Sequence, residues 1–203
     1  MPLARDHRKG RKVTKRRLES GMDRRSIVFG FTETSLGLAL AAASSTGICA
    51  IFLGDARSSL LLALRQRFPQ DELVEGEGDF LVQLSLVASF IEQPRLERKF
   101  GIDVQGTDFQ RQVWQALRDI PPGSTVSYAQ IARRIGRPRS VRAVAGACAA
   151  NKIAVAIPCH RVLRSDGDIS GYRWGVERKR KLLEREAPGA MAQAWLRPTM
   201  LSS

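Results

Sequence analysis

The chain contains few of the residue types that build metal sites and disulfide frameworks. Its 203 residues include three cysteines and two histidines. Cys49, Cys148 and Cys159 form no CxxC pair and are too few for a disulfide framework. His7 and His160 complete no familiar zinc spacing with them. We therefore expect a reduced, cytoplasmic protein that needs no metal and no other cofactor.

Long apolar runs are also missing. The apolar content of 43% is ordinary for a globular protein, and no apolar run is long enough to span a membrane. Residues 1–25 have no apolar core of the kind found in secretory signals. These absences predict a soluble chain without a membrane partner, long enough for one compact core or two small ones.

Acidic residues are fewer than basic ones. The chain has 20 Asp and Glu and 33 Lys and Arg, which gives a formal net charge of +13 at pH 7. This excess suggests a polyanionic partner or an acidic surface. Residues 1–25 carry ten Lys or Arg and three Asp or Glu, a net +7, and we interpret them as a disordered basic arm. The arm either attracts phosphates non-specifically or is a solvated linker, and the sequence leaves both open.

The first half of the chain after the arm reads as an α/β lobe. Ser26–Thr34 and 46–53 are short, apolar and rich in β-branched residues, which predicts strands, and 36–43 is a weaker third. A helix is expected over 55–68, with Asp55 as its N-cap. A second helix is expected over 78–92, because four apolar residues recur there at helical spacing.

The second half carries clear helix starts. Thr107-x-x-Gln110 and Ser127-x-x-Gln130 both fit the capping-box pattern. Gly136 is a stop signal for the helix that begins at Ser127. Two short helices around a tight glycine turn resemble a helix-turn-helix, although many helical hairpins share this pattern. The expected helices are 107–120, 127–135 and 139–150.

The run Ile157-Pro158-Cys159-His160-Arg161 is the strongest functional signal. Positive charge beside a cysteine favours the ionised sulfur and lowers its usual pKa of about 8.5. The alternative is a small buried hydrophobe, because free cysteine is among the most buried residue types. The neighbours favour a reactive thiolate. Arg161 either raises the local positive potential or forms a structural ion pair.

An ordered set of motifs over residues 106–186 resembles the O6-alkylguanine-DNA alkyltransferases, and it is most similar to the C-terminal half of the bacterial adaptive-response members. A sister family of DNA-binding non-enzymes carries tryptophan at the position of Cys159, so this residue favours an enzyme. In chain order the motifs are Phe109-Gln110-Arg111-Gln112-Val113-Trp114, Ile120-Pro121-Pro122-Gly123, Ser127-Tyr128, Arg142-Ala143-Val144, Asn151, Pro158-Cys159-His160-Arg161, Gly171-Tyr172-Arg173-Trp174-Gly175, Lys179, Leu182-Leu183 and Glu186.

The resemblance implies a fold of two lobes. Residues 26–98 would form a structural α/β lobe, ribonuclease-H-like, with a small antiparallel sheet and helices. Residues 99–187 would form a mostly α lobe with a winged-helix-like helix-turn-helix and the active site. The arm 1–25 and a C-terminal tail, 188–203, would flank them. The zinc ligands that some relatives carry are not present.

The resemblance also implies stoichiometric, irreversible transfer of an alkyl group from O6-alkylguanine in double-stranded DNA by a monomer. The sequence leaves open whether O4-alkylthymine is a second substrate. Cys159 would be the nucleophile and alkyl acceptor, in a single-turnover methyltransferase reaction. His160 would deprotonate it through a water, Glu186 would orient His160, and Tyr128 would donate a hydrogen bond to the departing guanine. Glu184 is the near alternative to Glu186.

Four residues of the expected helix 139–150 would contact DNA. Arg142 would fill the space left by the flipped nucleotide, because the O6 alkyl group cannot be reached inside a stacked duplex. Small residues beside it would let the helix enter the minor groove, although the same residues also suit tight internal packing. These further contacts are Ser140, Ala143 and Ala147.

Four other residues would shape the pocket. Asn151 would bridge the helix-turn-helix to the reactive segment, and Lys179 would be a further structural residue. Tyr172 and Arg173 would line the guanine pocket, where the bulk of Arg173 and Trp174 bears on tolerance for large alkyl groups.

Three alternatives from other classes remain at this point. A non-catalytic binder would flag alkyl lesions for other repair systems. A cysteine hydrolase would use the Cys-His pair with multiple turnover. A helix-turn-helix regulator would prefer a sequence over a lesion.

Overall fold

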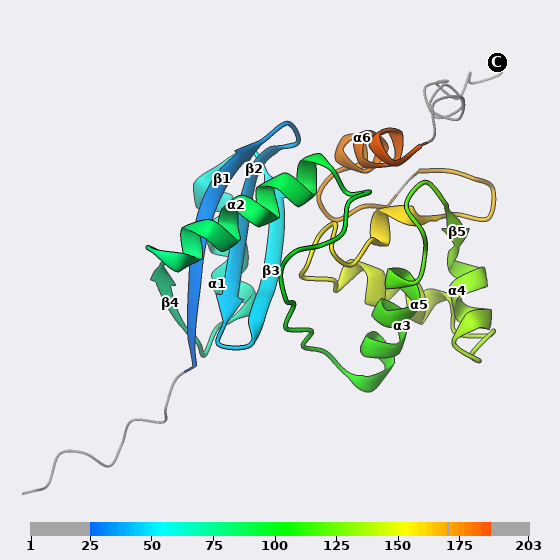
Figure 1. The fold of residues 1–203 in the computed structure, drawn as a ribbon. Coiled ribbons are helices and arrows are strands. Elements are labelled where there is room, and N and C mark those ends of the chain that lie inside the picture. Colours follow the sequence, from blue (N-terminus) through cyan, green and yellow to red (C-terminus); the bar gives the residue numbers. More distant parts are fainter. Residues whose placement is uncertain (1–24, 170, 188–203) are drawn as a thin grey trace, which may run out of the picture.

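The computed structural model describes residues 25–169 and 171–187, which form two lobes side by side (Figure 1). The first lobe contains a four-stranded sheet and two helices, and the second contains the remaining helices. The predicted basic arm, apart from Arg25, and the predicted tail 188–203 lie outside the described residues. None of the helices in the described ranges is long and apolar enough to cross a membrane.

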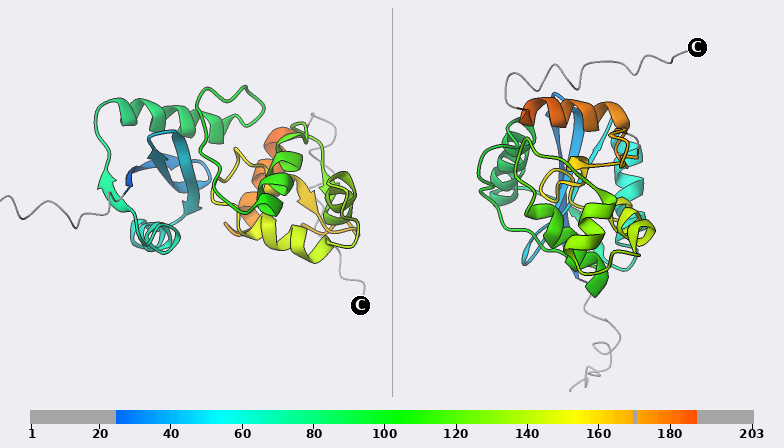
Figure 2. Two further views of the ribbon diagram at one scale, coloured as in Figure 1. Left: turned by 90° about the horizontal axis from the view of Figure 1, so that it is seen from below. Right: turned by 90° about the vertical axis from the view of Figure 1, so that its right-hand side faces the viewer.

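Three of the four strands are the predicted ones. β1 (Ser26–Thr34), β2 (Gly37–Ser44) and β3 (Gly47–Gly54) pair as antiparallel neighbours. Six consecutive residues are buried in β2 and again in β3. Continuous burial requires cover on both faces of the sheet, and Figure 2 shows a helix on each side of it.

The fourth strand corrects the expectation of a purely antiparallel sheet. β4 (Glu72–Glu75) pairs in parallel with β1, so the strand order is β3-β2-β1-β4. A helical crossover through α1 (Arg57–Arg67) brings the chain from β3 back in the same direction. Only Leu73 of the four residues is not exposed, which left too little apolar alternation for the sequence to reveal this strand.

The two helices of the first lobe begin differently. α2 (Asp79–Glu92) buries the predicted apolar face, which consists of Phe80, Leu84, Val87 and Ile91. The predicted cap of α1 is wrong, because its N-cap is Ala56 and no side chain caps it. Asp55 instead accepts a hydrogen bond from Arg178 of the other lobe.

In the second lobe, both predicted capping boxes are confirmed. Thr107 precedes α3 (Asp108–Arg118) and Ser127 precedes α4 (Tyr128–Arg134), each with reciprocal bonds to the glutamine three residues later. Gly136 then takes a φ of 70°, which lets the chain turn sharply. The remaining elements are α5 (Val141–Ala149), the 3₁₀ turn η1 (Cys159–Arg161), the paired strands β5 (Val126–Ser127) and β6 (Val162–Leu163), and α6 (Val176–Glu186).

The outer edge of β3 joins the lobes. Ile48 forms a parallel bridge with Ile102 of the linker, and Ile51 forms another with Ile153, which precedes the reactive segment. These bridges occupy a strand edge that would otherwise be open. The sheet therefore supports the backbone just upstream of Cys159.

Candidate active site

Cys159 lies in a pocket of about 370 Å³ in the second lobe. Cys159 is 8% exposed and is one of the residues that line this pocket. The walls come from the start of α4, the end of α5 and the segment after residue 170. The lining residues include Tyr128, Cys148, Ala149, Tyr172 and Arg173.

Asn151 fixes the reactive segment through three hydrogen bonds. Its Nδ2 donates to the carbonyl of Ile157 over 2.8 Å and to Sγ of Cys159 over 3.2 Å. Its Oδ1 accepts from the amide of Ile153 over 2.8 Å. Between these anchors Val155 has a φ of 65°, which is strained for a β-branched residue. The buried side chain of Asn151 therefore fixes the conformation of the backbone before Cys159.

The ionisation of Cys159 differs from the sequence expectation. Burial raises the pKa of the Cys159 thiol, while the hydrogen bond from Asn151 and the charge of Lys179 lower it in part. The expectation that the His-Arg pair supplies the lowering charge is wrong, because Arg161 is committed to Glu186. The free protein therefore holds a thiol that needs a base.

Glu186 connects His160 and Arg161 in a buried cluster. Its Oε1 lies 2.9 Å from Nε2 of His160, and both of its oxygens accept from Arg161 over 2.8 Å. Burial alone would raise the pKa of Glu186, but the hydrogen bonds from His160 and Arg161 and the charge of Arg161 lower it to about 2. The remaining Arg161 donor bonds the carbonyl of Ile120 over 2.5 Å. The question left open for Arg161 is thus answered by a structural ion pair.

The cluster determines which nitrogen of His160 is basic. Burial lowers the pKa of His160 despite the opposing effect of Glu186, so the ring is neutral at pH 7. Because the Glu186 carboxylate can only accept, Nε2 carries the hydrogen and Nδ1 keeps its lone pair. Nδ1 of His160 and the hydroxyl of Tyr172 are buried, and neither has a partner among the described residues. The two rings lie edge to face, 6.4 Å apart.

The walls of the pocket hold two further predicted residues. Burial raises the pKa of Tyr128 to about 12, so its hydroxyl is a donor at pH 7. Arg173 donates to the carbonyl of Ala149 over 3.3 Å, and its guanidinium lies 4.9 Å from the ring of Trp174. Arg173 therefore ties the wall after residue 170 to the end of α5.

Lys179 supports the segment that follows the cysteine. Its ammonium donates to the carbonyl of Val162 over 2.7 Å, and its side chain is fully buried. Burial lowers the pKa of Lys179, and the nearby Cys159 opposes this effect.

The predicted DNA-contacting residues of α5 divide between two faces. Arg142 and Ala143 are exposed and Ser140 is half-buried. Ala147 is only 3% exposed and its carbonyl accepts from the indole of Trp114 over 2.8 Å. A direct contact of its side chain with DNA is therefore a wrong expectation, because Ala147 is buried where α5 packs against α3.

Cys148 lines the pocket and was not predicted as a site residue. It is 6% exposed, and burial raises its pKa well above the usual range. Its place four residues after Val144 on the buried face of α5 was the available signal. In the described ranges no group of three or more His, Cys, Asp or Glu could hold a metal ion.

Comparisons with known proteins agree with this geometry. A family model described as "6-O-methylguanine DNA methyltransferase, DNA binding domain" matches residues 108–188. The solved structure of Mycobacterium tuberculosis OGT in complex with DNA is similar with a TM-score of 0.66 and 31% identity, over 81% of this chain and 98% of that one.

Two curated relatives extend the match. "Bifunctional transcriptional activator/DNA repair enzyme Ada" of Escherichia coli is 47% identical over 175 residues, which are 86% of this chain and 49% of that protein. The chain thus spans about half the length of Ada. The inducible "Methylated-DNA--protein-cysteine methyltransferase" of Bacillus subtilis is 40% identical over 122 residues, 60% of this chain and 68% of that one. The chain has a buried cysteine beside a His-Glu pair and is similar to these relatives over most of its length. It therefore belongs to the methylated-DNA–protein-cysteine methyltransferase family.

Proposed function

We propose that the protein repairs DNA by moving the alkyl group of O6-alkylguanine onto Cys159. The Cys159 thiolate attacks the alkyl carbon in line, a carbon–sulfur bond forms, and the bond between that carbon and O6 breaks. The electron pair leaves with the guanine. The product is a thioether that no residue in the pocket can cleave, so each molecule acts once.

The observation that carries this proposal is that Cys159 lines a pocket and is followed directly by an oriented, neutral histidine. Nδ1 of His160 has a free lone pair, and a water between it and Sγ would pass the thiol proton to it. The unpaired hydroxyl of Tyr172 would hold the same water, because buried polar groups usually find a partner. Glu186 would stabilise the imidazolium as the proton arrives.

Tyr128 would assist the leaving group. As guanine departs it gains negative charge, and a protonated phenol in the pocket wall can donate a hydrogen bond to a ring nitrogen. The raised pKa of Tyr128 ensures that this donor is present at physiological pH.

The partner would be double-stranded DNA from which the damaged nucleotide is flipped. The exposed Arg142 at the start of α5 would occupy the space that the nucleotide leaves, with Ala143 and Ser140 facing the minor groove. The net charge of +13 supports attraction to phosphates.

The proposal also covers the roles of the two lobes and of the chain ends. We assign residues 26–98 to a ribonuclease-H-like structural lobe and 99–187 to the DNA-binding and active-site lobe with a winged-helix-like helix-turn-helix. We further propose that 1–25 act as a basic arm, that 188–203 are a tail, and that the protein works as a monomer in the cytoplasm.

Mass spectrometry after mixing with an oligonucleotide that carries one O6-methylguanine tests the reaction. We expect one added methyl group on the peptide of Cys159, saturating at one per protein molecule. Cys159→Ala should bind the lesion and remain unmodified. An unmodified wild-type protein that binds the lesion would instead indicate the non-catalytic, lesion-flagging role.

A further inference from the structure

A second pocket, of about 240 Å³, shares no lining residue with the pocket of Cys159. One side is formed by the end of α2 and the linker after it, and another by the end of α3. The third side is the segment around Pro158. Three arginines from these parts line it, namely Arg98, Arg118 and Arg161.

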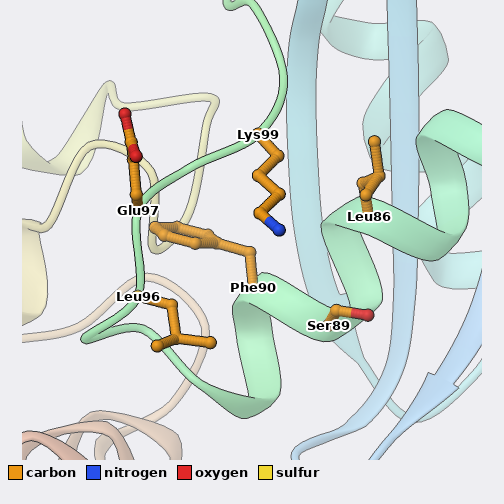
Figure 3. A pocket seen from close by; sticks show the side chains of 6 residues that line it. All are labelled: Leu86, Ser89, Phe90, Leu96, Glu97 and Lys99. Carbon is orange, nitrogen blue, oxygen red and sulfur yellow. The ribbon is translucent and has the colours of Figure 1, made fainter.

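Apolar side chains form the wall on the side of α2. Figure 3 shows Phe90 projecting from α2 toward the linker, with Leu96 below its ring. The same two residues line both the hollow drawn there and the arginine pocket. A ligand in the arginine pocket would therefore meet apolar carbon on this side and guanidinium groups on the others.

The charges of the pocket are not balanced. No Asp or Glu lines it, and only Arg161 has a carboxylate partner, Glu186. Arg98 donates to the carbonyl of Phe100 and stacks on its ring, while Arg118 has, among the described residues, only a long bond of 3.4 Å to Gln115.

Arg98 and Arg118 repel each other across this pocket. Burial lowers the pKa of Arg98, and the positive charge of Arg118 lowers it further. In the described part of the chain neither Arg98 nor Arg118 has a carboxylate within ion-pair distance. An anion between them would remove this repulsion.

We propose that Arg98 and Arg118 bind a phosphate group in this pocket. Guanidinium groups present several N–H donors in a planar fork that matches phosphate oxygens. Arg161 adds positive potential from the wall, although its own donors are already used by Glu186 and Ile120. The site is independent of the proposed alkyl transfer.

Titration of the full chain with inorganic phosphate, at constant ionic strength set by chloride, tests this site. We expect saturable heat in calorimetry and a rise in the melting temperature. Arg98→Gln and Arg118→Gln should each weaken phosphate binding about tenfold. Arg118 is exposed, so its variant is expected to fold normally.

Arg95→Gln is the matched control, because Arg95 is an exposed arginine of the same linker that does not line the pocket. It should bind phosphate like the wild type. A wild-type protein without saturable binding, or equal binding by Arg118→Gln and wild type, would overturn the proposal.

The source of the phosphate group is distinguished by repeating the titration with saturating undamaged duplex. No residue of α4 or α5 lines the pocket. Phosphate binding that disappears with duplex would assign the site to a DNA phosphate at a distance from α5. Binding that persists would assign it to a free phosphate or a phosphorylated small molecule.

Discussion

At the scale of single residues, Asn151 bonds more of the reactive segment than any other side chain described here. It holds the carbonyl of Ile157, the amide of Ile153 and the sulfur of Cys159. Asn151→Ala leaves the buried amide of Ile153 unpaired, which should cost about 1–3 kcal/mol in the free energy of unfolding, while the carbonyl of Ile157 keeps its bond from the amide of Cys159. Loss of its bond to Sγ should also raise the pKa of Cys159.

Urea unfolding and the pH dependence of Cys159 alkylation by iodoacetamide check this prediction. The alkylation profile of Asn151→Ala should shift to higher pH. A profile that coincides with that of the wild type would show that Asn151 does not influence the sulfur.

The buried Glu186 makes a prediction about acid stability. Its folded pKa of about 2 lies below its ordinary value of 4.5, so its contribution is present above pH 4.5 and is lost as the pH falls toward 2. The pKa of His160 is also lowered, from 6.5, so the unfolded chain binds this proton first and stability begins to decline below pH 6.5. Denaturant midpoints measured from pH 7 to pH 3 should therefore fall first below pH 6.5, because of His160, and fall further below pH 4.5, because of Glu186.

Glu186→Gln should destabilise the fold by about 3–5 kcal/mol, because Arg161 would remain buried without its carboxylate. Glu184→Gln, two residues earlier on α6 and without a side-chain partner among the described residues, is the control and should stay close to the wild type. Similar losses in both variants would contradict the role of the buried cluster.

At the scale of elements, the exposed residues of α5 allow DNA binding to be tested separately from the reaction at Cys159. Arg142 is exposed, so Arg142→Ala should change the free energy of unfolding by no more than about 0.5 kcal/mol. In the proposed reaction it should slow repair of O6-methylguanine in duplex DNA at least about tenfold, because the flipped state loses its support. Reaction with the free base O6-methylguanine should be unchanged.

Arg139→Ala is the comparison for this experiment, because Arg139 is a neighbouring exposed arginine that precedes α5. Equal slowing of duplex repair in both variants would mean that Arg142 contributes only general charge.

The capping box of α4 positions Tyr128, which is the first residue of this helix. Ser127 accepts from the amide of Gln130 and so fixes the first turn of the helix. Ser127→Ala should cost about 1 kcal/mol of stability, visible as a lower melting temperature. Ser124→Ala changes an exposed serine of the preceding turn and should have almost no effect.

Elements with strong local chemistry were predictable from the sequence, and those defined by distant contacts were not. The capping boxes of Thr107 and Ser127 need only four residues, so their helices began where expected. β4 depends on pairing with β1, and Arg161 on a partner 25 residues away, so neither could be read locally. The burial of Ala147 likewise depends on where α3 packs.

At the scale of the whole molecule, the net charge of +13 predicts how DNA binding responds to salt. Affinity should fall as salt rises, with a slope set by the number of phosphates neutralised. Removal of residues 1–24, which carry nine Lys or Arg and three Asp or Glu, should make this slope shallower if the arm contacts DNA. Fluorescence anisotropy at several salt concentrations measures it, and an unchanged slope would leave the arm as a solvated linker.

The first lobe braces the active-site lobe through its backbone. Trp174 donates to the carbonyl of Ile51, and Arg178 donates to that of Leu36. Arg185 donates in the same way to the carbonyl of Ile91. Every residue type offers a carbonyl, so these three contacts survive substitution of the accepting side chains. Substitutions of the side chains at Leu36, Ile51 and Ile91 therefore leave an acceptor in place for each of these bonds across the two lobes.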